Sequence, residues 1–165
     1  MTDAAFDPPE AASAPSRLKL ARWLALLVPA GLLGGALGSQ YLGGLYPCEM
    51  CYWQRWPHGV AVVLAALAFF ASGSRSLALT LLAAVAIAVS GSIGVYHALV
   101  ELGLAEGLTT CTATGGSLAD ILATPLIRCD QVQFAFLGIS MAGWNAIISL
   151  GSAIVIAWLV WSARR

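Results

Sequence analysis

The amino-acid sequence predicts an all-α membrane protein, a bundle of four transmembrane helices with two loops on the outer side of the membrane. The first reason is composition, because 10% of the 165 residues are charged and 59% are hydrophobic, whereas about a quarter of a soluble domain is charged. The second reason is that the charges are clustered between four long uncharged stretches. A helix of roughly 20 residues crosses a hydrocarbon core of about 30 Å, and each of the four stretches can hold one such helix.

We expect the four helices at residues 23–45, 57–72, 76–100 and 141–161. The second helix is short for a membrane span unless it extends back through Trp53. Residues 1–16 are rich in Ala, Pro and acidic residues and have no apolar pattern, which is typical of a disordered tail. The chain is therefore predicted to divide into a tail at 1–16 and a membrane domain at 17–165.

The distribution of Lys and Arg predicts which side of the membrane each loop faces. With four helices both termini lie on one side, and that side holds Arg17, Lys19, Arg22, Arg75, Arg164 and Arg165. The opposite side holds Arg55 and Arg128. Because basic residues accumulate in cytoplasmic loops, the tail and both termini are predicted to be cytoplasmic, and the loops at 46–55 and 101–130 to face outward. Eight basic residues balance eight acidic ones, which excludes the basic surface of a nucleic-acid-binding protein.

All four cysteines fall in the two outward loops: Cys48, Cys51, Cys111 and Cys129. A Cys-x-x-Cys pair such as Cys48 and Cys51 closes a small disulfide that is easily reduced, and the motif can lower a thiol pKa to about 3.5–7.5. Cys111 and Cys129 share one loop and are able to pair across it. Because disulfides persist outside the cytoplasm, this placement favours redox chemistry.

Other roles for these cysteines fit less well. A zinc site takes four closely spaced ligands, and Cys111 and Cys129 are too far apart in sequence to form a second knuckle. Covalent haem attachment needs a histidine after the second cysteine, and Tyr52 stands there. Two purely structural disulfides remain an alternative, although a bridge across two residues constrains only a tiny loop.

Arg55 lies four residues after Cys51, so the two share a face if this segment is helical. A guanidinium there would stabilise a thiolate at Cys51, as would the positive end of the second helix. Pro57 fits best in the first turn of a helix, which leaves open whether residues 51–55 are helical. The alternative for Arg55 is an interface arginine that binds lipid headgroups. His58 is expected to be an ordinary polar cap near the helix start.

The second outward loop contains a segment, residues 115–122, that predicts a short surface helix. Ser117 is a candidate N-cap, and Leu118, Ile121 and Leu122 share a face. That face would rest on the bilayer and keep the loop near the Cys-x-x-Cys pair.

Several segments are similar to those of one known family. They are Cys48-x-x-Cys51-x-x-Gln54-Arg55, Val95-Tyr96-His97-Ala98 followed by Glu101, Cys111 with Arg128-Cys129-Asp130, and residues 136–145. In this order they resemble the first-loop signature, the end of the third helix, the second-loop cysteines and the entry to the fourth helix of the DsbB family, the quinone-dependent disulfide bond formation proteins of bacterial inner membranes. The likeness extends over about residues 17–161.

The resemblance implies a multi-pass protein of the bacterial inner membrane with periplasmic cysteine loops, in a family that helps to keep the periplasm oxidising. The implied partner is a periplasmic DsbA-like dithiol oxidase with a thioredoxin fold, one thiol of which would attack a Cys111–Cys129 disulfide at Cys111. Cys129 would then attack Cys48. Cys51 would leave as a thiolate and pass its electrons to ubiquinone, or to menaquinone, from the quinone pool.

The resemblance also implies cofactor-binding roles for two residues. Arg55 would hold Cys51 as a thiolate and polarise a quinone carbonyl. His97 would hydrogen-bond the other carbonyl or help to supply protons, with a satisfied interface histidine as the alternative. No metal ligands are expected, and membrane lipid surrounds the bundle.

Two other functions are compatible with part of the pattern. One is a quinone-coupled thiol oxidoreductase of the vitamin K epoxide reductase type, but in that family the loop cysteines precede the Cys-x-x-Cys pair, which comes first here. The other is a non-enzymatic membrane scaffold with structural disulfides.

Overall fold

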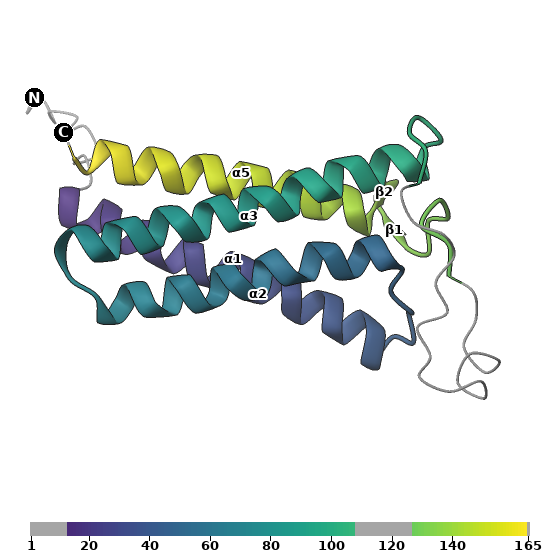
Figure 1. Cartoon of the computed structure of the whole chain (residues 1–165), viewed down its shortest axis with the longest axis horizontal. Helices are drawn as coiled ribbons and strands as arrows, with labels where there is room; N and C mark the ends of the chain where they lie inside the picture. The colour runs from purple at the N-terminus through teal and green to yellow at the C-terminus, as the bar shows by residue number, and fades with distance from the viewer. Residues whose placement is uncertain (1–12, 108–126, 165) are drawn as a thin grey trace, which may run out of the picture.

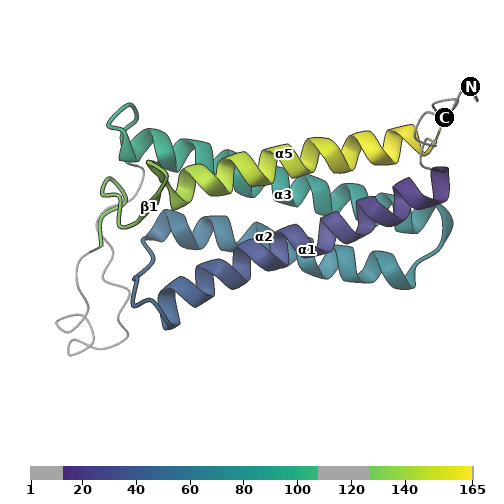
Figure 2. The ribbon, with the colours of Figure 1, turned by 180° about the vertical axis from the view of Figure 1, so that it is seen from behind.

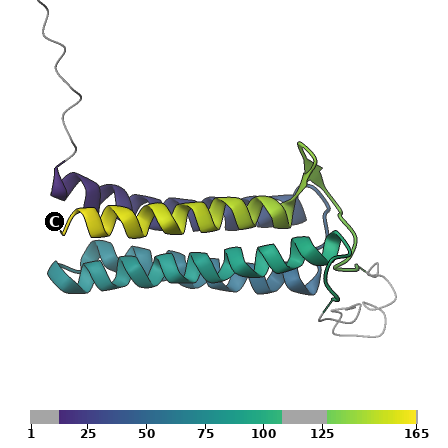
Figure 3. The same ribbon diagram turned by 90° about the horizontal axis from the view of Figure 1, so that it is seen from above.

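In the computed structural model, which describes residues 13–107 and 127–164, four helices form an up-and-down antiparallel bundle (Figure 1). They are α1 (Ala14–Tyr41), α2 (Glu49–Phe70), α3 (Gly73–Glu101) and α5 (Met141–Ser162). Around the bundle each helix packs against two neighbours, in the order α1, α2, α3, α5. Seen from above, α1 and α5 form one layer over α2 and α3 (Figure 3). The predicted all-α fold class is confirmed.

The two ends of the bundle differ in what they carry. The start of α1, the end of α5 and the connection between α2 and α3 lie at one end (Figure 1), where Arg17 Nη1 donates to the carbonyl of Ser162 at 3.4 Å. Cys48, Cys51 and Cys129 lie at the other end. At that end α1 diverges from α5 (Figure 2). The grouping of the start of α1 and the end of α5 opposite the three described cysteines agrees with the predicted topology, whereas the side of the membrane that each end faces stays a prediction.

Three of the helices, α1, α3 and α5, are long and apolar enough to cross a membrane. The first ten residues of α2 include Glu49, Gln54, Arg55 and His58, which lower its hydropathy. At 22 residues α2 is as long as α5, and it runs beside α3 along the bundle (Figure 1). We therefore describe α2 as the fourth span.

The expected boundaries hold for two helices and are wrong for two. The bounds of α3 and α5 lie within three residues of the predicted 76–100 and 141–161. α2 begins at Glu49 rather than at 57, because the Sγ atom of the N-cap residue Cys48 accepts a hydrogen bond from the Cys51 amide at 3.4 Å. Residues 51–55 are therefore a helical turn.

α1 spans Ala14–Tyr41 rather than residues 23–45. Its start is set by a proline in the first turn, where the missing amide hydrogen costs nothing. Residues 14–16 are thus helical and do not belong to a disordered tail. Residues 1–12 of the predicted tail, the predicted surface helix at 115–122 and Cys111 lie outside the described residues.

A short hairpin leads into α5. Strand β1 (Ala135–Phe136) pairs antiparallel with β2 (Ile139–Ser140), and the two turn residues Leu137 and Gly138 both have positive φ, 52° and 78°, as in a type I′ turn. The indole Nε1 of Trp144 donates to the carbonyl of Phe136 at 3.0 Å. This bond ties the hairpin to the first turn of α5.

Two glycines allow α3 and α5 to approach closely at the cysteine end. A Cβ atom on Gly91 would lie 2.9 Å from Leu150 Cγ, and one on Gly94 would lie 3.0 Å from the Ala142 carbonyl oxygen. Such small residues are typical of close helix packing in membranes. The approach brings the start of α5 against α3.

We expect Gly94→Val to destabilise the bundle by about 1–3 kcal/mol, because the new side chain meets backbone atoms of α5 that have no room to move. The matched control is Gly34→Val in α1, where a Cβ atom meets nothing within 4 Å and the change in helix propensity is the same. The thermal unfolding midpoints of the two variants in detergent measure the difference. Equal midpoints would show that the α3–α5 contact at Gly94 tolerates a side chain.

Candidate functional site

The Cys-x-x-Cys pair lies at the N-terminus of α2. Cys48 is buried, with 3% of its surface exposed, and its Sγ atom is 3.0 Å from that of Cys51. The hydrogen bond between the two sulfurs, together with burial, raises the pKa of the Cys48 thiol well above its ordinary value. Cys48 therefore keeps its proton, and Cys51 is the sulfur that can become a thiolate beside the positive end of the helix.

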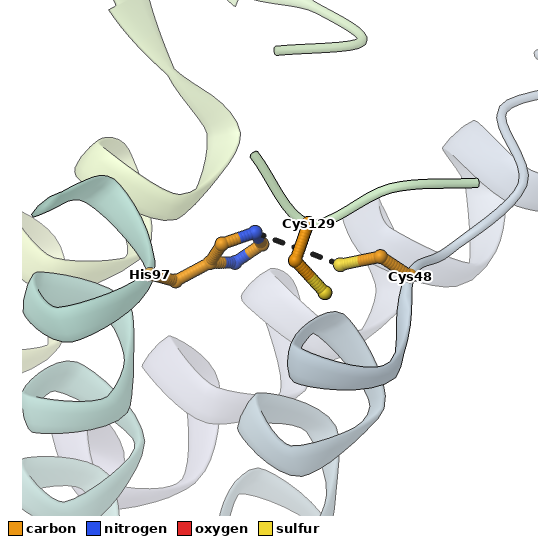
Figure 4. A group of neighbouring side chains, drawn as sticks. All are labelled: Cys48, His97 and Cys129. Atoms are coloured by element: carbon orange, nitrogen blue, oxygen red, sulfur yellow. Dashed lines mark hydrogen bonds between the residues drawn. The ribbon is translucent and has the colours of Figure 1, made fainter. Parts of the chain in front are cut away.

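Cys129 and His97 meet this pair from two other parts of the chain. His97 lies in the last turns of α3, and Cys129 lies in the segment before the hairpin. The Sγ atoms of Cys48 and Cys129 and a ring nitrogen of His97 all lie within 4.8 Å of one another (Figure 4). His97 Nε2 is 3.5 Å from Cys48 Sγ. The structure thus brings together Cys48, Cys51, Cys129 and His97.

Hydrogen bonds determine which nitrogen of His97 carries the proton. The amide Nε2 of Gln54 donates to the Met50 carbonyl at 3.2 Å and lies 2.8 Å from His97 Nδ1. The other end of this amide, Gln54 Oε1, accepts from Asn145 Nδ2 at 2.7 Å. Because the amide presents its N–H group to Nδ1, a neutral His97 carries its proton on Nε2.

His97 Nε2 therefore presents an N–H group, and Cys48 Sγ and the backbone of Cys129 both lie among its partners. It also lies 3.8 Å from Glu101 Oε1, on a carboxylate whose side chain is 8% exposed. An N–H group directed at sulfur stabilises negative charge that develops there when a disulfide bond to Cys48 breaks. This geometry suits His97 to proton donation at the cysteines, while the roles expected for it at a quinone stay predictions.

The cluster of Cys48, His97 and Cys129 also has the spacing of a metal site. A histidine that binds a metal through Nε2 usually donates its Nδ1 proton to an acceptor. Here Gln54 offers a donor to Nδ1. The hydrogen bonds as they stand fit donation from His97 to sulfur rather than metal coordination.

A cavity of about 550 Å³ opens beside the cysteines, between the end of α1 and the starts of α2 and α5. Small and apolar residues of α1, among them Gly31, Leu32 and Gly35, form one side. The other side carries the polar residues Cys48, Cys51, Gln54, Arg55, His58, His97 and Asn145. An apolar cavity with a few converging polar groups is the usual form of a small-molecule site.

Arg55 joins α2 to α1 in the wall of this cavity. Its Nη1 donates to Gln40 Oε1, and its Nη2 donates to the Ala36 carbonyl at 3.1 Å. The guanidinium also lies 5.2 Å from the ring centroid of Tyr52. These contacts hold the half-buried guanidinium between α1 and α2 in the cavity wall, and both expected roles, at a quinone and at a lipid headgroup, stay predictions.

The expectation for His58 is wrong. His58 is 3% exposed, and its Nε2 lies 2.9 Å from Ser90 Oγ on α3 and 2.8 Å from Asn145 Oδ1 on α5. Because α2 begins at Glu49, His58 lies in the third turn and faces the bundle interior. The four-residue spacing from Gln54 to His58 and the polar residues Ser90 and Asn145 within apolar spans were available signals, since polar groups inside membranes usually have a function.

The comparisons with known proteins agree on one family. A family model described as "Disulfide bond formation protein DsbB" matches residues 18–159. The chain belongs to the DsbB family. The DsbB resemblance seen in the sequence is therefore confirmed, and with it a membrane protein of disulfide bond formation.

Individual relatives cover most of the chain. A disulfide bond formation protein B of Methylococcus capsulatus is 33% identical over 156 residues, which cover 86% of this chain and 93% of the relative. Its counterpart in Xanthomonas oryzae pv. oryzae is 28% identical over 161 residues, covering 86% and 90%. That of Aromatoleum aromaticum is 33% identical over 131 residues, covering 73% and 78%. No solved structure gives a significant match.

Because the chain belongs to the DsbB family, the alternative of a vitamin K epoxide reductase-type protein is set aside. Gln54, His58, Ser90 and Asn145 form a largely buried hydrogen-bonded group that the sequence analysis did not assign to the site. This group connects α2, α3 and α5 directly beneath the cysteines.

Proposed function

We propose that this chain is a membrane thiol:quinone oxidoreductase that reoxidises a periplasmic DsbA-like dithiol oxidase with a thioredoxin fold. The proposal rests on one observation: three neighbouring cysteine sulfurs lie between the second loop and the cavity. Cys129 Sγ lies within 4.8 Å of Cys48 Sγ, and Cys48 Sγ is 3.0 Å from Cys51 Sγ. Cys51 lies in the cavity wall, so electrons can move by disulfide exchange to a small molecule bound there.

The exchange steps transfer two electrons from the partner dithiol to the Cys48–Cys51 disulfide. A thiolate of the partner attacks a Cys111–Cys129 disulfide at Cys111, and Cys129 leaves as a thiolate. Cys129 then attacks Cys48 in the Cys48–Cys51 disulfide, and Cys51 leaves as a thiolate. The second partner thiol resolves the mixed disulfide, which completes the partner's own disulfide and releases Cys111. Cys111 attacks Cys129, and Cys48 is released beside the Nε2–H of His97.

The cavity fits a quinone. Its α1 side is apolar, and Arg55 offers a guanidinium with five N–H donors, of which described residues engage two. A quinone bound here would accept two electrons and two protons as the Cys48–Cys51 dithiol becomes a disulfide. Arg55 would donate to a carbonyl oxygen, and Cys51 would face the ring. Ubiquinone is the proposed cofactor, with menaquinone as the alternative.

We place the protein in the bacterial inner membrane with its cysteine loops in the periplasm. Arg17, Arg75 and Arg164 belong to the end of the bundle opposite the cysteines, and basic residues accumulate on the cytoplasmic side. Disulfide chemistry at the other end then takes place in an oxidising compartment.

The test is reduction of quinone by a dithiol. Purified protein receives ubiquinone and a reduced thioredoxin-fold dithiol, and quinone absorbance is followed. We expect one quinone reduced for each dithiol oxidised. A scaffold with structural disulfides would leave the absorbance unchanged, and this outcome in the unmodified protein would remove the proposal.

A further inference from the structure

His58 has an unused nitrogen in a site that already contains the cysteines. The residue lines the 550 Å³ cavity, and its Nδ1 is buried with no hydrogen-bond partner among the described residues. A buried polar atom without a partner carries a desolvation cost, and such atoms are uncommon in native proteins. Because neighbouring atoms cover Nδ1, a ligand in the cavity supplies the missing partner by displacing a side chain from this atom.

The chemistry of that partner follows from the neighbours of His58. Ser90 Oγ donates its hydrogen to the Gln54 carbonyl at 2.8 Å, so this oxygen can only accept from His58 Nε2. Asn145 Nδ2 donates to the backbone carbonyl of Ser90 at 3.2 Å and to Gln54 Oε1, so Asn145 presents its oxygen to His58 Nε2 at 2.8 Å. Both neighbours of Nε2 are acceptors, so Nε2 carries a proton.

A neutral His58 therefore has a bare lone pair on Nδ1. A second proton on this nitrogen would place a positive charge in the apolar bundle, and no described carboxylate forms an ion pair with His58. Burying an unpaired charge costs far more than burying a lone pair. His58 Nδ1 is thus a hydrogen-bond acceptor, and its partner must be a donor.

We propose that His58 accepts a hydrogen bond from a hydroxyl group of the reduced ligand, a hydroquinone, and so makes the cavity prefer the quinol over the quinone. The inference rests on the proposed function. A quinone presents carbonyl oxygens, which cannot donate, whereas a hydroquinone presents two hydroxyl groups. The assignment makes His58 a residue that discriminates between the two redox states of the ligand.

The position of His58 suits this role. It follows Cys51 by seven residues on the same face of α2, and at a rise of 1.5 Å per residue it lies about 10 Å deeper in the bundle. A ligand with one edge at Cys51 and Arg55 then has its opposite edge near His58.

The test compares affinities for the two redox states in a pair of variants. In His58→Gln the amide nitrogen takes the place of Nε2 and can still donate to Asn145, while the Nδ1 acceptor is lost. In His58→Asn the side-chain oxygen lies near the place of Nδ1. Binding of decylubiquinone to the oxidised protein, and of decylubiquinol to the reduced protein without oxygen, is followed by the fluorescence of Trp144 and the other tryptophans. No net reaction takes place in either mixture.

We expect His58→Gln to bind decylubiquinol about three- to tenfold more weakly, the effect of one hydrogen bond, and to bind decylubiquinone as the unmodified protein does. His58→Asn should bind the quinol more tightly than His58→Gln. If His58→Gln leaves the ratio of the quinol and quinone affinities unchanged, the role given to His58 is overturned, while the proposed function stands. Absence of binding of both forms to the unmodified protein would overturn the proposed function as well.

Discussion

Replacing Cys51 by Ser will reduce quinone turnover to the rate without protein. Cys51 is the sulfur of the pair that lies at the N-terminus of α2 and in the cavity wall, while Cys48 holds its proton and contacts His97. Without Cys51 no dithiol can form beside the cavity, and two electrons have no route from Cys48 to the ligand. The measurement is quinone absorbance with a reduced thioredoxin-fold dithiol as donor.

A second readout separates loss of chemistry from loss of structure. In Cys51→Ser, Cys48 keeps its position within 4.8 Å of Cys129, so the disulfide between these two should still form and be found by peptide mass spectrometry under non-reducing conditions. The comparison variant Cys48→Ser should lose both turnover and this disulfide. Turnover at the normal rate by Cys51→Ser would refute the role given to this sulfur.

Replacing Arg55 by Ala will raise the KM for quinone by about ten- to a hundredfold, the range expected for one hydrogen bond to a charged group. The guanidinium is held in the cavity wall by Gln40 and the Ala36 carbonyl, so it needs no rearrangement to meet a carbonyl oxygen. Arg55→Lys should lie between the two, because lysine keeps the charge but lacks the planar set of donors. Steady-state rates at several quinone concentrations measure the effect.

The control for Arg55 is Arg75→Ala, at the exposed start of α3 and the opposite end of the bundle. It removes the same charge and should leave the KM unchanged. Transfer of one disulfide to the partner in the absence of quinone should still go to completion in Arg55→Ala, but more slowly, because Arg55 stabilises the Cys51 thiolate that leaves during exchange. An unchanged KM in Arg55→Ala would assign Arg55 to holding α1 against α2.

Local properties of the sequence were enough for much of the fold. Hydropathy and charge placement predicted the number of helices and closely located α3 and α5, because a membrane span needs a long uncharged segment whatever its neighbours are. The same reasoning misplaced the start of α2. There a polar segment is helical because Cys48 caps it and because the bundle surrounds Gln54 and His58, which are conditions that hydropathy does not measure.

The site divides in the same way. The sequence by itself determined which chemical groups are available: a Cys-x-x-Cys pair, two more cysteines in the second loop, and an arginine and a histidine that were predicted to lie near them. Only the tertiary structure decided that Cys129 and His97 meet Cys48, and that Gln54 and Asn145 orient His97 and His58. The reason is that residue types and spacing are local, whereas the facing of side chains from α2, α3 and α5 depends on how closely the helices pack, which Gly91 and Gly94 allow.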